Sequence, residues 1–160
     1  MHKIRKRGLL SPLFYFVLIL ACATSLKKQD IYFEMDGFRG IKWGMSLENV
    51  RKEMIFKGQN KLRGISWYQR KNEKFYLGDA RLSSIIYIFQ NKRLVAVNFI
   101  AKGRENFRKI KRFLENSLGK PSQANDNLKV YSWRLPKTIV LLSYAKLKET
   151  TFVILRNKEE

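Results

Sequence analysis

The apolar residues of this chain change their spacing in the middle of the sequence, and this change restricts the fold more than any other feature. Residues 65–69, 74–77, 82–90 and 93–101 are rich in aromatic and β-branched side chains, which favour β-strands. Both faces of the segment 93–101 are apolar, which is typical of a central strand. Asn91-Lys92 separates the last two segments and predicts a tight hairpin turn.

Two other stretches have helical spacing. Ser46 is a favourable N-cap, and apolar residues at positions 47, 50 and 54 follow it, so we expect a helix over 47–56. A second helix is predicted over 105–118, with apolar side chains on one side and basic side chains on the other. Gly119 and Pro121 favour the end of this helix.

The order of the predicted elements indicates the fold class. Three further strands are expected at 128–134, 138–144 and 151–156, and a first strand is expected at 31–35. We therefore expect an α+β fold: one antiparallel sheet with two helices on one face, because each helix offers a single apolar stripe. One helix followed by about three strands occurs twice, and this order is compatible with a duplicated α-β-β-β unit.

The N-terminal residues have the composition of an export signal. Four basic residues lie within the first seven positions, and the apolar run 13–21 ends directly before Cys22. A bilayer core requires about 20 apolar residues of helix, so this run suits a signal peptide better than a permanent span. The alternatives are an ordinary cleaved signal and a short uncleaved anchor, with Cys22 as a small apolar residue of that segment.

The sequence Ile19-Leu20-Ala21-Cys22 resembles the lipobox of bacterial lipoproteins. This resemblance implies that the chain is cut before Cys22, which then carries a diacylglyceryl thioether and further acyl groups such as palmitate. Cys22 is the only cysteine, so disulfides cannot stabilise the mature chain. The expected organisation is a lipoprotein signal peptide over 1–21, a polar tether over 22–30 and a single α+β domain over 31–157.

Two short pieces of the mature chain carry a second resemblance. Gly44-Met45-Ser46 opens the first predicted helix, and Leu118-Gly119-Lys120-Pro121 closes the second. Both pieces resemble small exported bacterial domains of unassigned function, and they are distantly similar to the small lipoprotein subunit of the outer-membrane β-barrel assembly machinery. The resemblance implies an envelope scaffold and no particular functional residues.

Candidate catalytic groups are few. His2 is the only histidine and lies in the signal, so the mature chain lacks histidine-based triads and metal sites. A lipidated Cys22 cannot act as a thiolate nucleophile. Glu34 and Asp36 are close in sequence, but such carboxylates more often neutralise nearby cations. We therefore expect no enzyme, no cofactor and no metal.

Net charge suggests a second kind of partner. The chain carries +20, and subtracting the four basic residues before Cys22 leaves +16 on the mature chain. Such a field attracts polyanions. Outside the cytoplasm we expect anionic lipids, lipopolysaccharide phosphates or wall polymers rather than nucleic acid; alternatively, the lysines are simply solvated. The candidate anion-binding residues lie on the second helix: Arg104, Arg108, Lys109, Lys111 and Arg112.

Aromatic residues interleaved with cations are compatible with a stacking platform, although small sheets also use such residues in their cores. These residues are Trp43, Trp67, Tyr68, Phe75, Tyr76 and Trp133.

The functional expectation is a non-catalytic, lipid-anchored interaction or scaffold module that faces the periplasm, held to the membrane through Cys22 and bound to an envelope protein. Ala23 replaces the aspartate associated with inner-membrane retention, which favours the outer membrane. The alternative is a binder of anionic envelope lipids or polymers through a basic face, and a hydrolase is third.

Overall fold

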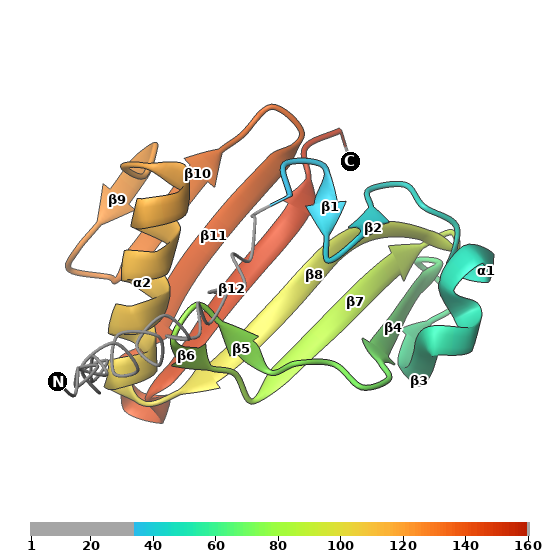
Figure 1. The fold of residues 1–160 in the computed structure, drawn as a ribbon, viewed down its shortest axis with the longest axis horizontal. Coiled ribbons are helices and arrows are strands. Elements are labelled where there is room, and N and C mark those ends of the chain that lie inside the picture. Colours follow the sequence, from blue (N-terminus) through green and yellow to red (C-terminus); the bar gives the residue numbers. More distant parts are fainter. Residues whose placement is uncertain (1–33, 160) are drawn as a thin grey trace, which may run out of the picture. The chain divides into compact units, whose positions relative to one another are not determined.

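A computed structural model describes residues 34–159 of the 160-residue chain (Figure 1). The predicted signal peptide, Cys22 and the tether 22–30 lie outside the described residues, as do positions 31–33 of the predicted first strand. The other two positions of that strand, Glu34 and Met35, are not in a strand.

The largest part of the structure is one antiparallel sheet of eight strands, so the protein is α+β with a large share of sheet. The spatial order of the strands is β3-β4-β7-β8-β12-β11-β10-β9. Their bounds are β3 Met54–Asn60, β4 Ile65–Arg70, β7 Ser84–Gln90, β8 Arg93–Lys102, β9 Gln123–Asn125, β10 Val130–Arg134, β11 Thr138–Ala145 and β12 Thr150–Asn157. Two short hairpins, β1 Gly37–Phe38 with β2 Ile41–Lys42 and β5 Tyr76–Leu77 with β6 Ala80–Arg81, stand apart from this sheet.

From each edge of the sheet to its centre, four strands follow one another in chain order. The first half of the chain contributes the meander β3-β4-β7-β8, and the second half contributes the meander β9-β10-β11-β12. The final strands of the two meanders, β8 and β12, pair in antiparallel fashion at the centre. Each half therefore supplies four strands to the sheet, where about three were predicted. The prediction that residues 93–101 form a central strand is confirmed.

The hairpin turn at Asn91-Lys92 is confirmed. Gln90 pairs with Arg93, so these two residues alone form the loop, and both have positive φ (46° and 64°), as a type I′ turn requires. Glycine usually occupies the second of these positions. Here backbone contacts hold the turn instead: the Leu47 amide donates to the Lys92 carbonyl at 2.7 Å, and the Asn91 amide donates to the Gly64 carbonyl at 2.9 Å.

The second predicted helix is confirmed as α2, Arg104–Leu118. It buries Phe107, Ile110 and Leu114 and ends at Gly119, whose φ of 79° suits a residue without a Cβ.

The first predicted helix is wrong in its length. Ser46 caps α1 as expected, but α1 covers only Leu47–Val50 and continues as a 3₁₀ turn, Arg51–Glu53. Residues from Met54 onward form strand β3 and pair with β4. The helical recurrence at 47, 50 and 54 was misleading because the pairing with β4 overrides it; Phe56, for example, packs edge-on against Tyr68.

Two smaller predictions also differ from the structure. Residues 74–77 contribute only β5, Tyr76–Leu77, which belongs to a separate hairpin and not to the large sheet. The edge strand β9 was not predicted, because its three residues are exposed, two of them are polar, and they lack a hydrophobic pattern.

The core lies on one face of the large sheet (Figure 1). Helix α2 covers part of this face and contacts β8, β12 and β6. The hairpin β1–β2 covers another part through Phe38, which packs on Tyr87 and Phe99. Hairpin β5–β6 packs on α2 so closely that a Cβ at Gly78 would lie 2.6 Å from Phe113. Most of this covering layer therefore consists of one helix and two hairpins rather than two long helices. None of the helices in the described part of the chain is sufficiently long and apolar to span a membrane.

Candidate functional site

The face of the large sheet opposite the core is apolar. Residues that pair directly across strands share a face, so the register identifies the side chains that point away from the core. Among residues 34–159, no helix or strand forms a layer over this face. We call it the open face; its apolar members are Ile55, Ile65, Trp67, Ile86, Ile88, Ala96, Ile100, Val130, Ile139, Leu141, Phe152 and Ile154.

The open face is large enough for a protein interface. Eight strands spaced about 4.8 Å apart span roughly 34 Å, and three rows of side chains cover roughly 20 Å along the strands. The resulting area of the whole face, polar members included, is on the order of 700 Å², close to the ~800 Å² that each partner contributes to a stable complex. Ile55, Val130 and Phe152 are 43%, 42% and 38% exposed, and the other apolar members are partly exposed. Large exposed clusters of apolar side chains commonly mark binding surfaces.

Positive charge is concentrated at one end of the open face. Arg134 and Arg156 both pair with Ile139 on the intervening strand, and they line a shallow pocket of about 290 Å³. Neither arginine side chain has a hydrogen bond or ion pair within residues 34–159, and the register places no carboxylate on this face. Near the centre, the buried Asn98 Oδ1 has no hydrogen-bond partner in the described part of the chain.

A second cavity, which we call the basic pocket, has a volume of about 510 Å³ and is lined by Arg104, Phe107, Arg108, Lys129, Tyr144, Lys146 and Glu149. Of the five predicted anion-binding residues, only Arg104 and Arg108 line it. Sequence reasoning missed Lys129 and Lys146, which reach the pocket from the turn before β10 and from the 3₁₀ turn Lys146–Lys148.

The other three predicted anion-binding residues lie elsewhere on α2. Lys109 pairs with Glu105 at 3.8 Å, and Arg112 is exposed. Lys111 pairs with Glu115 at 2.8 Å and lies over the ring of Tyr131, so the charge of Lys111 is already compensated.

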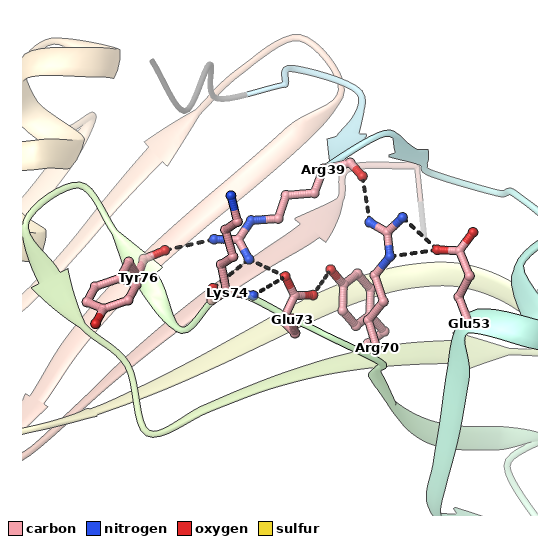
Figure 2. A network of polar contacts seen from close by, with 7 residues as sticks. Arg39, Glu53, Arg70, Glu73, Lys74 and Tyr76 are labelled. Carbon is pink, nitrogen blue, oxygen red and sulfur yellow. Dashed lines mark hydrogen bonds and ion pairs between the residues drawn. The ribbon is translucent and has the colours of Figure 1, made fainter. Parts of the chain in front are cut away.

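A buried carboxylate ties the hairpin β1–β2 to the loop after β4 (Figure 2). Glu73 is 4% exposed at its side chain and pairs with Arg39. Its other oxygen accepts a hydrogen bond from the Tyr87 hydroxyl at 2.6 Å. Arg39 also donates to the carbonyls of Lys74 and Tyr76 at 2.7 and 2.8 Å. This set of contacts, which we call the Glu73 network, holds together segments that are distant in sequence.

Arg70 extends the Glu73 network. It donates to the Arg39 carbonyl at 3.0 Å and pairs with Glu53 at 2.6 Å. Burial, followed by the hydrogen bond and the charge of Glu73, raises the pKa of Tyr87 far above its usual range. Tyr87 therefore keeps its proton and acts as a donor to Glu73.

Most of the other residues that the sequence singled out have structural roles. Trp133 and Tyr68 are buried in the core, and Trp43 donates to Thr138 at 2.7 Å; only Trp67 and the exposed Tyr76 point to a surface. The aromatic residues therefore do not form one stacking platform.

The two carboxylates singled out near the start of the domain also have local partners. Glu34 accepts a hydrogen bond from the Gly40 amide at 2.8 Å, and Asp36 pairs with Lys42 at 3.5 Å. Within residues 34–159, no group of three or more aspartate, glutamate, histidine or cysteine side chains could hold a metal ion.

Alkaline pH should weaken the fold through Tyr131. Burial, then the hydrogen bond to Asp126 at 2.5 Å and the charge of Asp126, raises the pKa of Tyr131 to about 12. The raised pKa of Tyr131 contributes fully to the free energy of unfolding below pH about 10, the pKa of an unfolded tyrosine. This contribution is lost as the pH rises toward 12, because the unfolded chain releases the hydroxyl proton of Tyr131 at a lower pH than the folded chain. We expect Tyr131→Phe to show a shallower fall in melting temperature than wild type between pH 9 and 12. An equal slope would contradict this assignment, and exposed Tyr76→Phe is the control.

No family model, no curated protein and no solved structure matches this chain.

Proposed function

We propose that this protein is a lipid-anchored, non-catalytic interaction module of a bacterial envelope. The open face carries this proposal, because it is a contiguous apolar surface without a covering layer in residues 34–159. The lipobox-like sequence Ile19-Leu20-Ala21-Cys22 supports an anchor at Cys22 and a periplasm-facing location, with the outer membrane favoured by Ala23. The basic pocket supports the alternative, binding of anionic envelope lipids or polymers.

The partner that fits the open face is a protein with an apolar surface bordered by carboxylates. Arg134 and Arg156 have no acidic neighbour on the open face and would pair with such carboxylates at the rim. A second copy of this chain fits less well, because two mature chains of +16 repel each other.

We also propose that the two halves of the domain arose by duplication. The mirrored strand order and the helix that precedes each four-stranded meander support this proposal.

Site-specific photo-crosslinking in cells tests the interaction proposal. A photoreactive phenylalanine analogue at Phe152 samples the open face, and the same analogue at Tyr76 samples the hairpin β5–β6 on the opposite side of the sheet. We expect the analogue at position 152 to give a protein adduct of one defined mass, and the analogue at position 76 to give no adduct of that mass. Adding Arg134→Glu and Arg156→Glu should reduce the yield of this adduct.

Three outcomes would contradict the proposed partner. An adduct with twice the mass of the chain would indicate a second copy, and an adduct with phospholipid alone would indicate a membrane surface. Equal adducts from positions 152 and 76 would indicate non-selective contact. The melting temperature of each variant confirms that it is folded.

A further inference from the structure

We propose that the basic pocket binds a phosphomonoester. The cavity holds about 510 Å³, within the range of about 300–1,000 Å³ that is usual for small-ligand sites. Four of its seven lining residues are cations, and they come from α2, the turn before β10 and the 3₁₀ turn before β12. A phosphate monoester, with nearly two negative charges and three acceptor oxygens, is the ligand chemistry that such a set recognises.

The cations of the basic pocket are poorly compensated. The side chains of Arg104, Lys129 and Lys146 have no hydrogen bond or ion pair within the described part of the chain. Arg108 pairs with Glu105, and the distance of 3.5 Å between its guanidinium nitrogen and the carboxylate oxygen is long for an ion pair. The lining therefore holds four cations and one carboxylate, Glu149. Gathering an excess of like charges disfavours the folded state, and a bound dianion would reduce this cost.

Two of the six non-glycine residues with positive φ in the described part of the chain line the same pocket. Lys129 has φ of 54° and Glu149 has φ of 43°, the left-handed region that glycine occupies without cost. Strained residues of this kind often occur at binding sites. At position 129, glycine would relieve the strain, whereas the lysine found there contributes a cation to the pocket.

The remaining lining residues indicate what is attached to the phosphate. The ring centroids of Phe107 and Tyr144 lie 5.0 Å apart, with the rings tilted by 31°, and these rings are the apolar part of the lining. Glu149 is an exposed carboxylate that can accept hydrogen bonds from hydroxyl groups. A phosphate carried by a polyol or a sugar satisfies both features, whether it is a lipid headgroup or a free sugar phosphate.

Calorimetric titration of the full chain with glycerol 3-phosphate tests this proposal. We expect saturable binding of one equivalent, and no binding of glycerol. Lys129→Gly should lower the affinity about tenfold, as loss of one charge-assisted contact predicts. The same variant should melt at a temperature about 2–4 °C higher than wild type, because its backbone strain is relieved.

Two further arms make the result decisive. Lys137→Gln removes an exposed charge outside the basic pocket and should leave the affinity within about twofold. A short-chain phosphatidic acid, compared with glycerol 3-phosphate, distinguishes a lipid source from a soluble one: tighter binding of the lipid indicates a headgroup, and equal binding indicates a free phosphate. Absence of glycerol 3-phosphate binding, or equal affinity losses in both variants, would overturn the proposal. Neither result depends on a protein partner at the open face.

Discussion

Replacing Arg39 with alanine is expected to lower the free energy of unfolding by about 3–5 kcal/mol. The substitution leaves the carboxylate of Glu73, 4% exposed at its side chain, without its cationic partner. The hydrogen bonds from Tyr87 and from the Lys74 amide remain, but neither donor carries a charge. The variant also loses the two contacts that Arg39 makes with the carbonyls of Lys74 and Tyr76.

Urea unfolding followed by tryptophan fluorescence measures this effect. Arg134→Ala is the matched control, because Arg134 is an exposed arginine without a side-chain partner in residues 34–159; its effect should stay within about 0.5 kcal/mol. Adding Glu73→Gln to Arg39→Ala should recover part of the loss, since the double variant no longer buries an unpaired charge. A loss below about 1 kcal/mol in Arg39→Ala would show that Glu73 is not held as a buried charge.

Replacing Cys22 with alanine is expected to abolish acylation of the chain. If Cys22 carries two or more acyl chains, each buried methylene contributes about 0.8 kcal/mol, so the anchored chain does not dissociate appreciably. The variant has no thiol for the thioether and should leave the membrane fraction or retain its N-terminal segment. Intact mass of the membrane-extracted wild type should show a chain that begins at Cys22 and carries acyl groups.

Two results would exclude the lipoprotein assignment. An unmodified chain cut at another position would indicate a soluble exported protein. An uncut chain that still carries Met1 would remove the argument for export and would make nucleic acid a candidate partner for the positive charge.

The sequence was sufficient to predict the elements that are set by interactions between residues close together in the chain. Helix α2 was predicted within one residue because its apolar side chains repeat at helical intervals and Gly119 follows it. Strands β7, β8, β11 and β12 were predicted because they are rich in β-branched residues, and the turn at Asn91-Lys92 because it separates two of them.

Sequence reasoning failed where a segment fits two structures. Residues 54–60 follow a capped helical turn and continue its apolar spacing, yet they are paired with β4. The short edge strand β9 has no hydrophobic pattern at all and exists because β10 offers it hydrogen bonds. In both places hydrogen bonds to the next strand decide the structure, and the apolar spacing within the segment does not record them.

The residues of the candidate sites also fall into those that the sequence predicted and those that only the tertiary structure revealed. Arg104 and Arg108 were predicted from the basic side of one helix, because residues four apart share a helix face. Lys129 and Lys146 join them only through the packing of α2 beside β10 and β11. Similarly, alternation within the strands indicates two apolar faces, but it does not reveal which face receives α2 and the hairpins.

The sequence by itself determined the α+β class, the helix α2, the central strand β8 and its turn, and it carries the whole argument for export and lipidation. Tertiary structure alone decided the pairing of β8 with β12, the Glu73 network, the open face and the full set of cations in the basic pocket. The physical reason is range: capping, turn formation and side-chain periodicity act within a few residues, whereas strand pairing and the burial of charges depend on groups far apart in the chain.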